Sequence, residues 1–168
     1  VAPIAYDPNA GAELLAKATS EIARSLDKGA AKGMTAPGVA EAARARLSTE
    51  ADLAKAVSGA DIVVEAVFED LALKKDLFAR LDAAAPPGAI LATNTSSLPV
   101  TEIAAATGRP GLVLGMHFFN PVPLMPLLEI VRTAATSAEA VEAAVEAGRR
   151  MGKQCIVVRD SPGFATSR

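Results

Sequence analysis

The sequence has little cysteine and little histidine, and this scarcity excludes several classes of protein. Cys155 is the only cysteine among the 168 residues, so the chain has neither an internal disulfide framework nor a cysteine-rich metal site. It lies in the apolar run Gln154–Val158, which predicts a strand and therefore a buried, unreactive thiol. His117 is the only histidine and no cluster of acids accompanies it, so the sequence predicts no metal site.

An excess of charge and a long apolar run are also absent. The chain has 17 Lys and Arg against 19 Asp and Glu, a net charge of −2 that gives no electrostatic case for binding nucleic acid or an anionic membrane. No apolar run approaches membrane-spanning length and no secretory signal is visible. Together with the single cysteine, these features predict a reducing, cytoplasmic setting. The length of 168 residues is enough for one α/β domain with a sizeable core, and the 51% hydrophobic content argues against disorder.

Short apolar runs alternate with segments of helical spacing along most of the chain. The predicted strands are 1–6, 61–68, 89–93, 111–116, 127–131 and 156–158, and the main predicted helices are 13–32, 35–45, 70–85 and 137–151. This alternation predicts an α/β fold with a doubly wound, largely parallel sheet and helices on both of its faces.

A Gly-x-Gly sequence, the core of a dinucleotide-binding loop, occurs nowhere in the chain. Asp7 nevertheless ends the first predicted strand, and two interpretations of it stay open. Asp7 is an ordinary turn former before Pro8, or it is the ribose-binding acid that follows such a loop by about 20 residues. In the second case Val1 begins at the second strand of a truncated nucleotide-binding domain, and Asp7 alone does not decide between them.

Acidic side chains follow the strand predicted at 61–68. In doubly wound sheets, ligands bind at the carboxyl ends of the strands, which is where Glu69 and Asp70 fall. The alternative is that these acids favour the N-terminus of the next helix through its dipole. We prefer this alternative for Asp70 and consider a ligand-binding role for Glu69.

Five consecutive small polar residues, 93–97, follow the next predicted strand. A capping role accounts for Ser97, at the start of the following helix. A run of five exceeds what a cap needs, so the sequence favours Asn94 and Ser96 as ligand-binding residues.

His117 opens a proline-rich segment, and Glu129 lies twelve residues further along the chain. If the chain reverses near Pro123, the imidazole and the carboxylate meet, and a histidine oriented by a carboxylate can transfer a proton near neutral pH. A structural histidine is the alternative. A hydrolase built from Ser96, His117 and Glu129 is a third possibility, although no Gly-x-Ser-x-Gly elbow is present.

Four motifs occur in a fixed order: Val64–Asp70, Asn94–Leu98, His117–Pro123 and Asp160–Phe164. In order and spacing this set resembles the 3-hydroxyacyl-CoA dehydrogenase family. The resemblance implies that residues 1–159 form a partial, Rossmann-like NAD-binding domain that lacks its first strand and glycine-rich loop. It further implies that 160–168 begin a linker or helix to an absent all-helical domain, which supplies much of the contact in a homodimer.

The resemblance also implies roles for particular residues. His117 corresponds to the catalytic base and Glu129 to its partner. The implied catalytic residues are His117, Glu129, Ser96 and Asn120; those that bind NAD are Asp7, Ala66, Glu69, Lys74, Asn94, Ser96 and Asn120; and those that contact the CoA substrate are Ser25, Lys32, Lys74, Ser96 and Asn120. Ser167 stands where the family often has asparagine.

The activity implied by this resemblance is the reversible, NAD-dependent oxidation of an L-3-hydroxyacyl-CoA to a 3-oxoacyl-CoA, in fatty-acid β-oxidation or a butyryl-CoA-type pathway. Asp7 favours NAD over NADP because its carboxylate would repel a 2′-phosphate. The alternative is a non-catalytic fragment or relative that binds only nucleotide or CoA. The missing loop favours that alternative for this chain alone, which we expect to be inactive in isolation.

Overall fold

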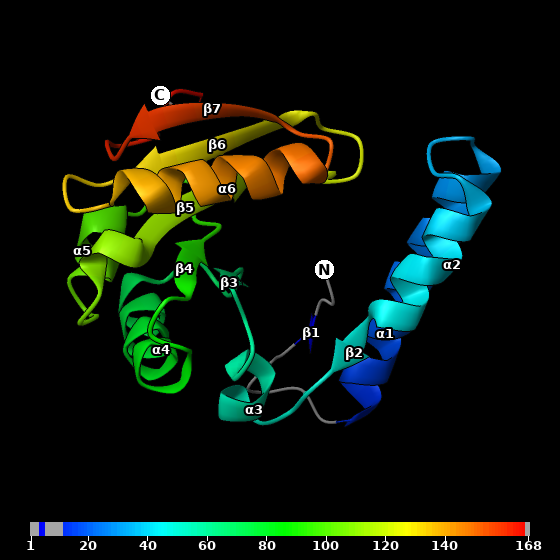
Figure 1. The fold of residues 1–168 in the computed structure, drawn as a ribbon, viewed down its shortest axis with the longest axis horizontal. Helices are drawn as coiled ribbons and strands as arrows, with labels where there is room; N and C mark the ends of the chain where they lie inside the picture. The colour runs from blue at the N-terminus through cyan, green and yellow to red at the C-terminus, as the bar shows by residue number, and fades with distance from the viewer. Residues whose placement is uncertain (1–3, 6–11, 167–168) are drawn as a thin grey trace. The chain divides into compact units, whose positions relative to one another are not determined.

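The computed structural model describes residues 4–5 and 12–166. The chain divides into two compact units, Val1–Ser58 and Gly59–Arg168. Figure 1 shows the helices and strands of both units. Asp7 and Ser167 lie outside the described residues, as does most of the strand predicted at 1–6.

The first unit is a helical hairpin beside a small parallel sheet. Its elements are β1 (Ile4–Ala5), α1 (Ala12–Ala31), α2 (Pro37–Arg46), β2 (Ser48–Thr49) and α3 (Leu53–Val57), and β1 pairs with β2 in parallel. An ion pair of 3.0 Å between Arg44 and Asp27 joins α2 to α1. The Asp52 carboxylate accepts a hydrogen bond from the Lys55 N–H and so caps α3. The predicted helices 13–32 and 35–45 are confirmed.

The second unit contains a five-stranded sheet in the order β3-β4-β5-β6-β7. Its elements are β3 (Ile62–Glu65), α4 (Leu71–Ala84), β4 (Ile90–Thr93), α5 (Val100–Ala104), the 3₁₀ turn Pro110–Leu112, β5 (Val113–Phe118), β6 (Leu127–Arg132), α6 (Ala138–Arg150) and β7 (Gln154–Arg159). All neighbouring strands run parallel except β5 and β6, which are antiparallel. The predicted alternation and the mostly parallel sheet are therefore confirmed.

Strand β6 shows that helices cover both faces of this sheet. Ile130 packs in a buried cluster with Ala140 and Ala144 of α6, which lies along one face (Figure 1). The next residue, Val131, points to the other face and packs against Val100, at the start of α5. Because successive residues of a strand face opposite sides, the odd-numbered side chains of β6 belong to the α5 face.

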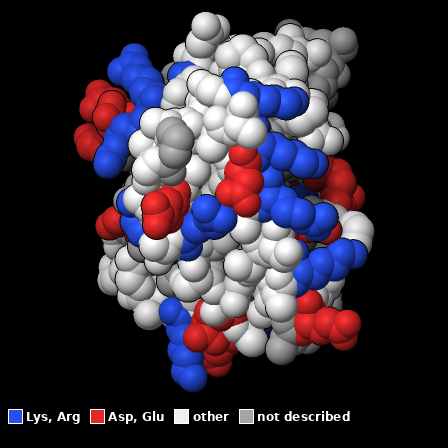
Figure 2. All heavy atoms as spheres, turned by 90° about the vertical axis from the view of Figure 1, so that its right-hand side faces the viewer, with Lys and Arg blue, Asp and Glu red and all other residues white. Residues whose placement is uncertain are grey.

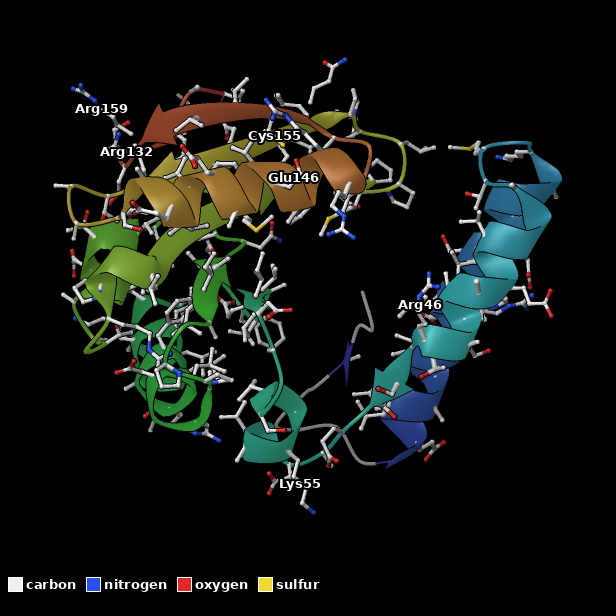
Figure 3. The ribbon with its side chains drawn as sticks, in the orientation of Figure 1. Arg46, Lys55, Arg132, Glu146, Cys155 and Arg159 are labelled. Atoms are coloured by element: carbon white, nitrogen blue, oxygen red, sulfur yellow. The ribbon has the colours of Figure 1, made fainter. Side chains whose placement is uncertain are left out.

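Cys155 lies in β7, as predicted, and its side chain faces α6 (Figure 3). The thiol is half-buried, so the prediction of a fully buried thiol was wrong, and its Sγ lies 3.6 Å from the Val145 carbonyl oxygen. Burial raises the pKa of the Cys155 thiol, and the nearby Arg149 charge opposes this only in part. Since the thiolate is the reactive form, the expectation of an unreactive cysteine agrees with this environment.

The surface carries both signs of charge. Figure 2 shows acidic and basic side chains interspersed over the face that it presents. One local exception lies at the ends of β6 and β7, where the register partners Arg132 and Arg159 are both exposed (Figure 3). Among the described residues, no helix is long and apolar enough to cross a bilayer.

Candidate active site

The His117–Glu129 pair is formed by the antiparallel strands β5 and β6. His117 and Glu129 are directly opposite in the register, and His117 Nδ1 lies 2.7 Å from Glu129 Oε2. The residues are 5% and 0% exposed, so the contact is shielded from water. The chain reversal expected near Pro123 therefore brings the imidazole and the carboxylate together, as the spacing predicted.

The surroundings of this pair determine which atom of the imidazole is available. The ring centroid of Phe119 lies 4.5 Å from that of His117, and Phe164 approaches at 5.7 Å in an edge-on geometry. The Ala165 N–H donates to Glu129 Oε1 at 3.1 Å, which leaves Oε2 for the histidine. Because a carboxylate only accepts, Nδ1 is the nitrogen that carries the proton in the neutral imidazole, and Nε2 of that tautomer has the free lone pair.

Nε2 of His117 is also accessible. It has no hydrogen-bond partner within the described part of the chain. No buried side-chain nitrogen or oxygen there lacks a partner, so this nitrogen must reach the surface of the protein. The ring is thus packed against two phenylalanines, fixed at Nδ1 and open at one nitrogen, an arrangement that suits a general base.

Asn94 connects the carboxyl ends of three strands. Its side-chain Oδ1 accepts the Phe118 N–H at 2.9 Å, and its own N–H donates to the Glu65 carbonyl oxygen at 2.8 Å. The amide NH2 has no partner among the described residues and, by the reasoning applied to Nε2, is accessible. It therefore offers a hydrogen-bond donor at the edge of the sheet where such folds bind ligands.

Glu69 organises the loop that follows β4. Its Oε1 accepts the N–H groups of Ser96 at 3.0 Å and Ser97 at 3.4 Å, together with the Thr95 hydroxyl. Burial alone would raise the pKa of Glu69, but these hydrogen bonds and the Lys74 charge outweigh it and lower the pKa. The Ser96 side chain is left exposed at the loop surface.

A buried ion pair beneath this loop was not predicted. Lys74 Nζ lies 2.6 Å from Glu65 Oε1 and 3.5 Å from Glu69 Oε2, and both Lys74 and Glu65 have side chains only 1% exposed. Glu65 also accepts the Thr93 hydroxyl at 2.7 Å and the Val67 N–H at 2.6 Å. The Lys74 ammonium is held by protein oxygens, so its expected contacts with NAD and CoA stay predictions.

The other predicted site residues are more dispersed. Ala66 follows β3 and Asn120 follows β5, and both are exposed at the same edge as Asn94. Ser25 lies on α1 and Lys32 just after it, in the first unit, and both are exposed. No hydrogen bond joins Ser96 to His117 in the described residues, so the Ser-His-acid arrangement of a hydrolase is not formed.

Sequence reasoning missed three residues of this region. Glu65 is the one charged residue of the strand Ile62–Glu65, and a lone charge in an apolar strand was a usable signal. Phe164 and Ala165 contact the pair from a turn far away in the sequence, and only the motif ending at Phe164 hinted at them.

The residues at this edge fit a dinucleotide. The ends of β3, β4 and β5 present an open amide donor, an exposed serine and an open imidazole nitrogen, and ligands of doubly wound sheets bind in this position. Fold and site thus define an α/β domain of the Rossmann-like, nucleotide-binding class.

Comparison with known proteins gives the family. The description "3-hydroxyacyl-CoA dehydrogenase, NAD binding domain" matches residues 5–161, and the chain belongs to this family. A probable 3-hydroxybutyryl-CoA dehydrogenase of Bacillus subtilis is 43% identical over 165 residues, which are 97% of this chain and 56% of the relative. The mitochondrial hydroxyacyl-coenzyme A dehydrogenase of Rattus norvegicus is 42% identical over 161 residues, 93% of this chain and 51% of the relative.

Solved structures share the fold of this chain. The crystal structure of M. tuberculosis FadB2 superposes with a TM-score of 0.91 at 37% identity, covering 99% of this chain and 58% of FadB2. The chain spans about half the length of the relatives that it matches.

Proposed function

We propose that the protein containing this chain oxidises an L-3-hydroxyacyl-CoA to the 3-oxoacyl-CoA, reversibly and with NAD, in fatty-acid β-oxidation or a butyryl-CoA-type pathway. The observation that carries the proposal is the buried His117–Glu129 pair with its one open nitrogen. Membership of the family supports NAD as the cofactor and hydroxyacyl-CoA as the substrate class.

His117 acts as the base in this proposal. The substrate hydroxyl lies against Nε2 and transfers its proton there, while the C3–H bond breaks and its electron pair leaves as hydride. NAD, when bound, supplies the acceptor for that hydride. Glu129 holds the proton on Nδ1 and stabilises the imidazolium that forms, since its oxygen lies 2.7 Å from that nitrogen. In the reverse direction, the imidazolium returns the proton to the carbonyl oxygen.

In this proposal the remaining polar groups bind and orient the cofactor and the substrate. Asn94 offers its amide NH2 at the strand ends, and Glu69 holds the loop that presents Ser96. We infer that Asn94, Ala66 and Glu69 line the NAD side and that Ser96 and Asn120 lie between cofactor and substrate. Binding of CoA by Ser25 and Lys32, the homodimer and the cytoplasmic setting stay predictions.

The test uses the full-length protein with a 3-oxoacyl-CoA and NADH. Oxidation of NADH is expected, without release of free CoA. Free CoA without NADH oxidation would identify a thioesterase, and no reaction with retained binding would identify a non-catalytic relative. His117→Ala should lower kcat by roughly 10²–10⁴. Near-normal turnover in that variant would exclude the proposed mechanism.

A further inference from the structure

The turn that follows β7 covers the His117–Glu129 pair. Phe164, which is 1% exposed, packs edge-on against His117 with ring centroids 5.7 Å apart. The next residue, Ala165, donates its N–H to Glu129 Oε1 at 3.1 Å. This turn therefore contacts both members of the pair, the imidazole through an aromatic ring and the carboxylate through a hydrogen bond.

The backbone of the turn has an unusual conformation. Phe164 has a φ of 51°, in the left-handed region that bulky residues other than glycine rarely adopt. The Phe164 N–H donates to the Ser161 carbonyl oxygen at 2.9 Å, and the ring is buried against Val100 and Val131. Strained backbone of this kind persists where surrounding contacts enforce it, and it concentrates at functional sites. Here it directs the Ala165 N–H to Glu129.

Asp160 anchors the start of the turn. Its Oδ1 accepts the Val100 N–H at 3.2 Å, and its Oδ2 accepts the Thr101 N–H at 2.7 Å and the Thr101 hydroxyl at 2.5 Å. These partners are the first residues of α5, about sixty positions earlier in the chain. Val100 also packs against Phe164, so anchor and turn share one buried cluster.

We propose that Asp160 is a positioning residue for the reaction, acting through this turn on Glu129; the proposal rests on the function proposed above. Glu129 has two oxygens and two partners. When the Ala165 N–H occupies Oε1, Oε2 remains directed at His117 Nδ1. Without the Asp160 anchor the turn relaxes, Oε1 loses its donor, and the carboxylate no longer has a single orientation toward the imidazole.

The test compares variants of the full-length protein by steady-state formation of NADH. Asp160→Asn keeps the size of the side chain but places an NH2 group among three donors. We expect kcat to fall about 10- to 100-fold, the scale of a small misplacement of reacting groups. The KM values for NAD and acyl-CoA should stay within about twofold, because neither contact is altered.

Two substitutions of Thr101 test whether the loss of kcat follows the number of hydrogen bonds to Asp160, and a third substitution is the matched control. Thr101→Val removes one of the three hydrogen bonds of Asp160 and should give a smaller loss of kcat, whereas Thr101→Ser keeps the hydroxyl and should restore normal turnover. Asp52→Asn makes the same change of carboxylate to amide at the N-cap of α3, which has five residues like α5, and no hydrogen bond joins Asp52 to His117 or Glu129 in the described part of the chain. Its kcat should be unchanged.

A spectroscopic measurement separates positioning from general destabilisation. The ring signals of His117 in the ¹⁵N-histidine spectrum are assigned by their loss in His117→Gln. Asp160→Asn should shift them toward a mixture of tautomers, and Asp52→Asn should not. If Asp160→Asn matches Asp52→Asn in both kcat and ring signals while His117→Gln is inactive, the positioning role is overturned and the function stands. An active His117→Gln overturns the function itself. If Asp160→Asn does not fold, Thr101→Val decides.

Discussion

Replacing Glu129 by glutamine tests the proposed chemistry with almost no change of shape. The carboxylate accepts from two groups, the Ala165 N–H at Oε1 and His117 Nδ1 at Oε2. Glutamine has only one carbonyl oxygen to offer. If it faces Ala165, its NH2 meets Nδ1, which must then lose its proton. The histidine proton moves to Nε2, and the open nitrogen is no longer a base.

The opposite orientation of the glutamine is unfavourable. Its oxygen would face Nδ1, but its NH2 would oppose the Ala165 N–H and leave a donor unsatisfied. Such a group costs about 1–3 kcal/mol, so the inactive orientation is favoured by about 5- to 150-fold. The imidazolium also loses its counter-charge in both orientations. We therefore expect Glu129→Gln to lower kcat by roughly 10²–10⁴.

The assay for Glu129→Gln is NADH formation with separate determination of kcat and of the KM for NAD. The fall should be confined to kcat, and the ¹⁵N shifts of the His117 ring should show the proton on Nε2. The control is Glu146→Gln, the same change on the exposed surface of α6 (Figure 3), which should leave turnover unchanged. Equal losses of kcat and NAD affinity would show that Glu129 is structural, and an unchanged tautomer would refute the orientation argument.

Two further predictions concern stability. Lys74→Met leaves Glu65 buried without its counter-charge and should lower the free energy of unfolding by about 3–5 kcal/mol in urea denaturation. The double variant Lys74→Met/Glu65→Gln should recover most of the lost free energy of unfolding. If the double variant is as destabilised as Lys74→Met alone, the loss comes from packing and not from the unpaired charge. The pKa of Asp82 lies below its usual 3.8. A hydrogen bond from the Gly108 N–H and the guanidinium of Arg109 lower this pKa, and partial burial opposes them. A lowered folded-state pKa stabilises the protein above the unfolded-state pKa, and this gain is lost as the pH falls through the folded value. Asp82→Asn should therefore lower the free energy of unfolding at neutral pH by about 1–3 kcal/mol. The difference in this free energy between wild type and variant should shrink below pH 3.8. A difference that does not change with pH would contradict the assigned role of the Asp82 carboxylate.

Local pattern predicted most of the fold. The β-branched run Ile62–Val64 and the helical spacing before Pro86 gave correct elements because hydrophobic periodicity is set by each segment itself. The His117–Glu129 contact could also be predicted from the sequence, because a short reversal between two strands brings residues at equal distances from the turn opposite each other.

Contacts between segments that are distant in the sequence could not be predicted in this way. Lys74 meets Glu65 only because α4 packs with that side inward, and no spacing rule between a strand and the following helix specifies this rotation. The contact of Ala165 with Glu129 depends on the left-handed backbone conformation of Phe164. A phenylalanine, unlike a glycine, does not indicate this conformation in a sequence. Such contacts follow from packing of the whole unit and cannot be read from one segment.

The two buried glutamates of this unit show why the surroundings decide function. Glu65 has Lys74, the Val67 N–H and the Thr93 hydroxyl as partners, and its charge is compensated within the protein. Glu129 has one backbone donor and the only imidazole of the chain. An imidazole with one open nitrogen can accept a proton from a substrate and return it, whereas the partners of Glu65 have no such opening in the described residues. In the proposed reaction, Glu129 is therefore the glutamate that stabilises a charge that appears and disappears, whereas Glu65 holds Lys74 and the end of β4 in place.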